Sequence, residues 1–338
     1  MTATPSVYKL NLPPERFVSV PAGRLRGFVC EAALALGMPD AQAGQLAELL
    51  TGNDLRGVHS HGTRMFAHYA DELRGGRLNP APGPRVTRET PVSLVVDGDG
   101  GLGYFAALLA TERAIDKARE VGVAVAVTRN HGHIGAAGIY ARMTLPHDLL
   151  CFVTGGARPN IEPGMPVYSS AVGSPMCFSA PASDADPLIV DFSPVYDLRS
   201  SPHREELEDW IPGTIFRCIG LGNIAQAWGG VLAGVPQERD ALPPRFASAH
   251  QAAAFMMFRI DLFLDPAEFR RQMDVLAERI AELAPLPGFP KAQFAGAPEA
   301  ERARRYAVEG IPVGDEHRRE LEALADALGI DTPWERAG

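Results

Sequence analysis

Apolar residues recur along this chain with two periods that alternate from segment to segment. Spacings of three or four residues predict helices over 21–37, 39–50, 65–73, 105–122, 139–143, 221–232, 266–283 and 315–328. Short apolar runs rich in β-branched residues predict strands over 92–97, 123–127, 149–154, 188–192 and 255–264. Because strands and helices alternate, the expected fold class is α/β.

The composition narrows the class of protein. The chain has 338 residues, 46% of them hydrophobic and 22% charged, which is typical of a soluble globular protein with a sizeable core. It carries 41 acidic and 32 basic residues, a formal net charge of −9, and no basic cluster, so we expect no nucleic-acid partner. No apolar run approaches the length of a membrane span, and the start lacks the pattern of a signal peptide. We expect a soluble, cytoplasmic enzyme without a membrane partner.

Two histidine-rich turns are the first candidates for chemistry. One runs from His59 to Gly62 and the other from His131 to Gly135, each among small residues at the border of a predicted element. Imidazole exchanges protons near neutral pH, so both turns could supply a general acid or base. The alternative is that these histidines are solvated or cap a helix. His-x-His pairs also occur in metal sites, but no third ligand completes such a motif here, so no metal is expected.

A glycine-rich segment, Gly98 to Gly103, follows a predicted strand and precedes a predicted helix. It matches G-x-G-x-x-G, the pattern that holds a dinucleotide pyrophosphate at a helix N-terminus. Asp97 and Asp99 would place carboxylates beside those phosphates, however, and a tight structural turn explains the glycines equally well. Asp191, at the end of a buried strand, either faces a site or forms a turn.

Several segments together resemble the malate/L-lactate dehydrogenase-like family, which includes type 2 lactate dehydrogenases, ureidoglycolate dehydrogenase and piperideine-2-carboxylate reductase. They are Asp54 through Gly62, Tyr69, Asp97-Gly98, Gly101-Leu102-Gly103, and Asn130 through Gly138. The resemblance implies a non-Rossmann α/β fold. A mixed sheet within 90–299, with a shortened 191–217 segment, would bind NAD or NADP. A helical domain would form from both chain ends, 1–80 and 300–338. The resemblance also implies a homodimer, and it makes the glycine-rich turn structural.

The resemblance also implies roles for individual residues. His61 would lie beside the substrate and the nicotinamide, with Ser60 hydrogen-bonding nearby, and His133 would be the proton acceptor. Asp191 would orient a histidine ring and stabilise its protonated form. The cofactor-binding candidates are Ala157, Asp191, Phe192, Ser193 and Arg217, the last standing where the family has a lysine. The substrate-binding candidates are His59, Arg64 and Tyr69.

The chain also departs from the family pattern. The family arginine that clamps the substrate carboxylate is Met65 here, and the nearest arginine, Arg64, comes one residue early. A Gly-Thr-Asn-Pro motif has become Gly173-Ser174-Pro175, and a late Pro-Gly-Glu has become Ala295-Gly296-Ala297. The substrate is therefore expected to differ from a plain 2-oxo acid, and cofactor binding is expected to be weak.

The primary hypothesis is a nicotinamide-dependent oxidoreductase in specialised metabolism. It would reduce a small 2-oxo acid or a cyclic imine carboxylate, or oxidise the 2-hydroxy or amino partner, and His61 or His133 would supply the proton. The alternative is a cofactor-free family member that uses the same histidines for non-redox acid/base chemistry, as an isomerase, cyclase or lyase. A third hypothesis is a non-catalytic relative retained for binding.

Overall fold

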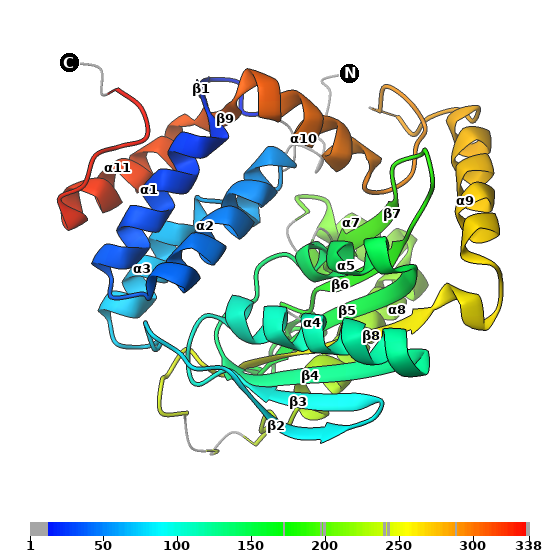
Figure 1. Ribbon diagram of the computed structural model, residues 1–338, viewed down its shortest axis with the longest axis horizontal. Coiled ribbons are helices and arrows are strands. Elements are labelled where there is room, and N and C mark those ends of the chain that lie inside the picture. The colour runs from blue at the N-terminus through cyan, green and yellow to red at the C-terminus, as the bar shows by residue number, and fades with distance from the viewer. Residues whose placement is uncertain are drawn as a thin grey trace. The chain divides into compact units, whose positions relative to one another are not determined.

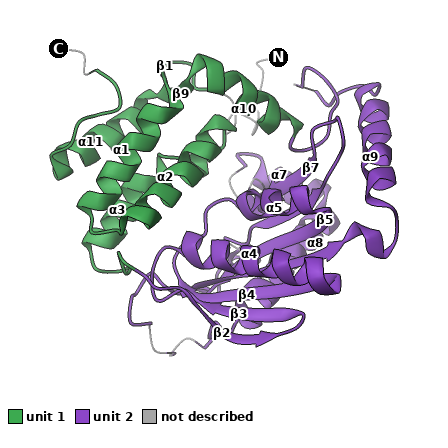
Figure 2. Cartoon of the chain, viewed as in Figure 1, with its two compact units in different colours: residues 1–81, 297–338 green, residues 82–296 purple. Residues whose placement is uncertain are grey.

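The computed structural model describes residues 13–171, 173–196, 198, 201–238, 241, 244–287 and 289–335. The chain divides into two compact units, one formed by residues 1–81 with 297–338 and the other by residues 82–296 (Figure 2). The first unit therefore joins both ends of the chain, and the second is continuous.

The first unit is mainly helical. Its helices are α1 (Ala22–Ala35), α2 (Asp40–Leu55), α3 (Met65–Arg74), α10 (Ala297–Glu309) and α11 (Asp315–Leu328). A short antiparallel pair, β1 (Phe17–Val20) and β9 (Ile311–Gly314), ties the N-terminal part of the unit to its C-terminal part. A 3-10 turn, η2 (His59–His61), connects α2 to α3. The apolar stripe of α2 is buried, as its spacing predicts.

The second unit is built on a seven-stranded sheet in the order β2-β3-β4-β8-β5-β6-β7. The strands are β2 (Arg85–Thr90), β3 (Ser93–Asp97), β4 (Val123–His131), β5 (Leu149–Ala157), β6 (Met176–Ala180), β7 (Leu188–Phe192) and β8 (Gln251–Arg259). Only the β3–β4 pair is parallel, and the other five pairs are antiparallel. This sheet confirms the prediction of a mixed, non-Rossmann α/β fold, since a Rossmann sheet is mostly parallel.

Helices cover both faces of this sheet (Figure 1). The helices α4 (Gly103–Val121) and α5 (Gly138–Thr144) pack on one face, over a core that includes Val153 and Phe255. Residues of opposite parity, such as Phe152 and Ala254, face the other side. There they meet α8 (Pro212–Ala225) and the π-helical turn η5 (Gln226–Val231) with the residues after it.

The remaining elements are short or lie outside this core. They are α7 (Arg204–Trp210), α9 (Pro266–Ala281) and the 3-10 turns η3 (Leu145–His147), η4 (Val167–Ala171) and η6 (Ile260–Leu262). The strand expected over 255–264 is shifted, because β8 begins at Gln251 and the chain turns at η6. Its first half is alanine-rich and gives no β signal, yet Ala252 and Ala254 pack against Ala233. Small side chains let the segment after η5 approach the sheet.

Candidate active site

In the first unit, the end of α2 fixes the turn that carries His59, Ser60 and His61. The side-chain amide of Asn53 donates a hydrogen bond to the backbone carbonyl of His61 at 2.8 Å. The His61 amide in turn donates to Val58 at 3.0 Å, which closes the 3-10 turn. Both the carbonyl and the amide of His61, the candidate catalytic histidine, are therefore fixed by hydrogen bonds.

Asp54 is the hub of this region and is fully buried. Its carboxylate accepts hydrogen bonds from the Thr63 amide at 2.8 Å and the Thr63 hydroxyl at 2.6 Å, and it lies 3.0 Å from His59 Nδ1. The Thr63 hydroxyl also lies 3.0 Å from Nε2 of His317 on α11. A Cβ atom on Gly62 would collide with the Asp54 carboxylate, so this position requires glycine. A buried carboxylate that makes three contacts with two residues, Thr63 and His59, organises the whole turn.

The environment of His61 favours its neutral form. Burial lowers the pKa of His61 below the ordinary value for histidine. Its Nδ1 lies 3.0 Å from the Ser60 hydroxyl, and the tautomer decides which of the two atoms donates. When Nδ1 donates to the Ser60 hydroxyl, Nε2 is the unprotonated nitrogen of the neutral ring and can accept a proton.

The substrate-binding candidates of this unit have other contacts in the structure. The Arg64 guanidinium donates to both Glu320 oxygens, at 2.9 and 3.1 Å, and pairs with Glu316 at 2.9 Å. The hydrogen bonds to Glu320 are the main cause of the raised pKa of Arg64. A substrate carboxylate would have to compete with two carboxylates already in place. Tyr69, on α3, is 1% exposed and belongs to the core.

In the second unit, the glycine-rich segment Gly98–Gly103 is hydrogen-bonded to the histidine turn and the residues just before it, 129–133. Amides of the first segment donate to the second: Gly98 to Arg129, Gly100 to Asn130 and Gly103 to His133, at 2.9, 2.9 and 3.0 Å. The amides that a dinucleotide fingerprint would offer to a pyrophosphate are thus already used. The Gly98–Gly103 segment is a structural turn between β3 and α4, as the family resemblance implies.

The two histidines of the second turn have different surroundings. His131 is fully buried, with Nδ1 donating to the Gly132 carbonyl and Nε2 lying near the Thr128 hydroxyl, both at 2.7 Å. Burial lowers the pKa of His131 to about 4, so it is a neutral structural residue. His133 is only half-buried, and it lies in the loop that leads from β4 into α5. Of the two, His133 is the candidate for proton transfer.

Asp191 lies at the exposed end of β7 and reaches the start of α5. Its Oδ2 accepts a hydrogen bond from the Gly138 amide at 2.7 Å. This contact fixes the loop between His133 and α5, and it places a carboxylate at a helix N-terminus, where negative charge is stabilised. Phe192 is exposed and Ser193 half-buried directly after it.

The remaining cofactor candidates lie at or near the turn η5 and helix α8. The amide of Ala157, at the end of β5, donates to the Gln226 side chain at 3.1 Å. A Cβ on Gly156 would meet the backbone of Gly230, so η5 packs directly on the end of β5. Arg217 lies on α8 and is exposed. The shortened 191–217 segment includes residues 197, 199 and 200, which lie outside the described residues.

Three residues that hold the first turn in place were not predicted from the sequence: Asn53 on α2, Thr63 directly after the turn, and His317 on α11. Asp54 was predicted only as part of the family pattern. Asp54 continues the buried stripe of α2, four residues after Leu50, and a carboxylate on an apolar stripe signals a buried network. His317 likewise begins the buried stripe of α11, but nothing in the sequence connects it to Thr63, 254 residues away.

The described residues contain no group of three or more histidine, cysteine or acidic side chains placed to hold a metal ion. Within the same part of the chain, no helix is long and apolar enough to cross a membrane.

Comparison with known proteins gives the family. Residues 20–195 match the malate/L-lactate dehydrogenase family, and the chain belongs to it. The malate dehydrogenase of Pyrococcus horikoshii is 25% identical, over 94% of this chain and 97% of that protein. The L-sulfolactate dehydrogenase of Methanocaldococcus jannaschii is 27% identical, over 87% and 93%. The ureidoglycolate dehydrogenase (NAD(+)) of Escherichia coli K12 is 25% identical, over 89% and 92%.

Solved structures agree with this assignment. The P. horikoshii malate dehydrogenase structure superposes with a TM-score of 0.81, at 25% identity, over 95% of this chain and 98% of that chain. The delta1-piperideine-2-carboxylate reductase of Pseudomonas syringae has the same fold, with a TM-score of 0.69 at 19% identity, over 91% and 100%. The relatives are dehydrogenases, so the protein is an oxidoreductase of this type, as the sequence predicts.

Proposed function

We propose that the protein is a nicotinamide-dependent oxidoreductase of a small 2-oxo acid or cyclic imine carboxylate, working in either direction. The observation that carries the proposal is the hydrogen bond that the Gly138 amide donates to the Asp191 carboxylate, which holds this carboxylate and the loop containing His133 in one arrangement. The relatives support it, since malate, L-sulfolactate and ureidoglycolate dehydrogenases are named for substrates of the 2-hydroxy acid type.

The residues present fit a nicotinamide dinucleotide in part. Asp191 offers an exposed carboxylate, a group that binds ribose hydroxyls, and Arg217 offers an exposed guanidinium that would meet a phosphate. Ala157, Phe192 and Ser193 would line the same site, although the Ala157 amide is already bonded to Gln226. The bound cofactor would supply the hydride. The Ala157 amide already donates to Gln226, and the 191–217 segment is short. We therefore propose that the nicotinamide cofactor binds weakly, and we assign no preference between NAD and NADP.

The chain's own residues would handle the proton. His61, kept neutral by burial and bonded to Ser60, can accept a proton when the substrate is oxidised. His133 is the second acid/base group, and Asp191 would stabilise a neighbouring imidazolium. His59, paired with Asp54, would shape the substrate side, and Tyr69 would support this region from the core, whereas Arg64 would hold the turn through Glu316 and Glu320. We further propose that the enzyme works in the cytoplasm as a homodimer.

The decisive experiment is a titration with NADH and NADPH that follows nicotinamide fluorescence. We expect saturable binding with a dissociation constant between about 10 μM and about 1 mM, and a further weakening in Arg217→Ala. Arg279→Ala, on the distant exposed helix α9, is the matched control and should bind as the wild type does. His61→Ala and His133→Ala should each lower turnover at least about a hundredfold. Absence of binding at about 1 mM, together with His61-dependent turnover of any substrate, would replace the proposal with a cofactor-free acid/base enzyme.

A further inference from the structure

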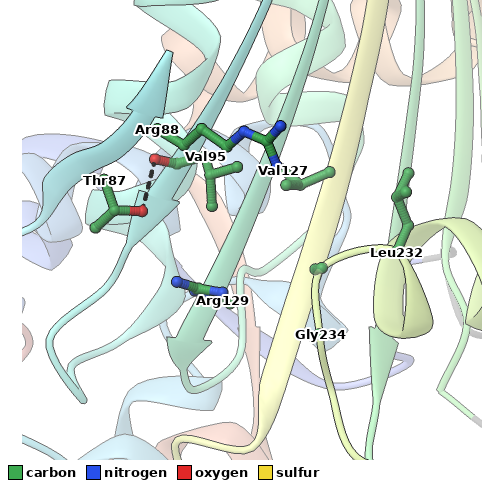
Figure 3. A pocket seen from close by; sticks show the side chains of 8 residues that line it. Thr87, Arg88, Val95, Val127, Arg129, Leu232 and Gly234 are labelled. Carbon is green, nitrogen blue, oxygen red and sulfur yellow. Dashed lines mark hydrogen bonds between the residues drawn. The ribbon is translucent and has the colours of Figure 1, made fainter.

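The second unit contains a hollow that the proposed redox function does not use. It has a volume of about 400 Å³ and lies against the face of β2, β3 and β4 that α4 leaves open. Its lining combines two arginines with a valine floor and one wall from the segment that follows η5 (Figure 3): Thr87, Arg88, Val95, Val127, Arg129, Leu232, Ala233 and Gly234.

A β-bulge aims Arg88 into this hollow. The register of β2 on β3 shifts between Val86 and Arg88, so Thr87 is the extra residue, and its hydroxyl donates to the Val95 carbonyl at 3.3 Å. Without the bulge, Arg88 would alternate to the face that packs on α4. With it, Arg88 stands opposite Val95, which in turn pairs with Val127 on the hollow's floor. Bulges that re-aim a side chain are frequent next to binding sites.

Arg129 enters the same hollow from β4, two residues beyond Val127. Among the described residues, neither Arg88 nor Arg129 forms an ion pair or a side-chain hydrogen bond. Asp97 is the acidic neighbour of Arg129 on β3, but its Oδ1 already accepts from Asn130 and from the Asp99 amide, both at 2.9 Å. Two uncommitted guanidinium groups thus share one concave site on an acidic protein.

A second hollow of about 220 Å³ shares Arg129 and Gly234 with the first. It adds His250, whose Nδ1 is buried and has no hydrogen-bond partner among the residues described. Gly234 adopts a positive φ of 87°, and a Cβ there would lie 3.7 Å from the Arg129 guanidinium. Because residue 234 is a glycine, no side chain from this position lies between the two hollows. An orphaned buried nitrogen beside an uncommitted arginine indicates a polar ligand.

We propose that this hollow binds a small doubly charged oxyanion, a dicarboxylate or a phosphate monoester with a compact apolar body. Guanidinium groups bind carboxylate and phosphate oxygens through paired N–H donors, and Arg88 and Arg129 provide two such groups. Val95, Val127 and Leu232 contact the apolar body, and His250 hydrogen-bonds the end that extends into the second hollow. The binding does not depend on the nicotinamide cofactor.

Isothermal titration of the full chain at constant ionic strength tests this site, with malonate and glycerol 3-phosphate as probes. The probe that binds more tightly identifies the ligand class. We expect saturable binding of at least one probe below about 1 mM, and a loss of about tenfold or more in Arg88→Ala and in Arg129→Ala. Both arginines are partly or fully exposed, so the variants should keep the wild-type thermal midpoint. Arg279→Ala should bind the probe as the wild type does.

Three results would overturn the proposal. One is the absence of saturable binding of both probes up to about 10 mM. Another is binding that neither arginine variant weakens. The third is displacement of the bound probe by NADH, which would make the hollow part of the cofactor site. Unchanged probe binding with NADH present supports a separate site.

Discussion

The carboxylate of Asp191 and the amide of Gly138 are joined by a 2.7 Å hydrogen bond across 53 residues of sequence. The bond links the end of β7, an edge strand, to the first residue of α5. Because His133 lies in the loop between β4 and α5, this contact restrains the position of a candidate catalytic histidine. It also leaves Asp191 at an exposed strand end, where a ligand can reach it.

Two variants of Asp191 distinguish the role of its hydrogen bond to Gly138 from the role of its negative charge. Asp191→Asn keeps an acceptor oxygen for the Gly138 amide, whereas Asp191→Ala removes it. We expect both variants to lower kcat/KM, by at least about a hundredfold for alanine, since the charge that stabilises an imidazolium is lost in each. Hydrogen exchange at Gly138 should accelerate only in the alanine variant. An asparagine variant with wild-type turnover would show that the negative charge has no part in catalysis.

Oxidation and reduction should respond oppositely to acid. Burial lowers the pKa of His61, so the ring is neutral at neutral pH and can accept a proton. Oxidation should therefore stay active down to a pH below the ordinary histidine value, while reduction, which needs the protonated ring, should accelerate as the pH falls. Profiles of kcat/KM in both directions measure this, with exposed His68→Ala as the control. An apparent pKa for His61 above the ordinary value would contradict the assignment.

The sequence predicted the parts of the fold that depend on local periodicity. The stripe of α2 and the apolar run of β5 are buried as expected, because a single face or a fully buried strand leaves a regular pattern. It did not predict β2, whose residues RVTRET are mostly polar and lie on a sheet edge. It also missed β1 and β9, since each is stabilised only by pairing with a segment at the other end of the chain.

The residues of the candidate site also fall into a group that could be predicted from the sequence and a group that could not. The histidine turns were visible because histidine and glycine are informative residue types at element borders. The partners of Arg64 could not be predicted from the sequence, because Glu320 is 256 residues away. A single arginine near the histidine turn is equally consistent with a substrate clamp and with a structural ion pair. The role of Asp54 depends on Thr63 and Gly62 folding back over it, and only the three-dimensional structure shows this contact.

A pair of glycine-to-alanine variants tests that contact. Gly62→Ala forces the new Cβ against the Asp54 carboxylate, which cannot move without losing its bonds to Thr63. We expect a loss of about 1–3 kcal/mol in the free energy of unfolding and a fall in turnover. Gly44→Ala, within α2 with nothing near its Cβ, should instead stabilise by about 0.5–1 kcal/mol. Urea titration compares the two, and a neutral Gly62→Ala would mean that the turn relaxes freely.

Homodimer formation is the expected assembly. Trp210 on α7 and Phe216 on α8 are each 73% exposed, and large apolar side chains of this kind are commonly covered by an interface. Sedimentation at micromolar concentration should give twice the mass of one chain. Phe216→Ser should shift the population toward monomer, while Phe263→Ser, at an exposed turn after η6, serves as the control. A wild-type monomer would contradict the expectation.

His131 should make the protein sensitive to mild acid. Burial lowers its pKa in the folded chain to about 4, whereas the unfolded chain keeps the ordinary value of 6.5. Between these values the unfolded state binds more protons, so stability is fully present above pH 6.5 and is lost as the pH falls toward 4. The full shift corresponds to about 3 kcal/mol. Burial also lowers the pKa of His317, which acts in the same direction.

Urea midpoints measured at about pH 7 and about pH 5 test this dependence. The wild type should lose stability over that interval, and His131→Asn, which cannot titrate, should lose less while starting from a lower value. His68→Gln removes an exposed histidine and should keep the wild-type slope. Within the described part of the chain the His131 ring bonds to the Thr128 hydroxyl and the Gly132 carbonyl, so its effect should appear in stability before it appears in turnover. An identical pH slope in wild type and His131→Asn would show that the pKa of this ring is the same in the folded and unfolded states.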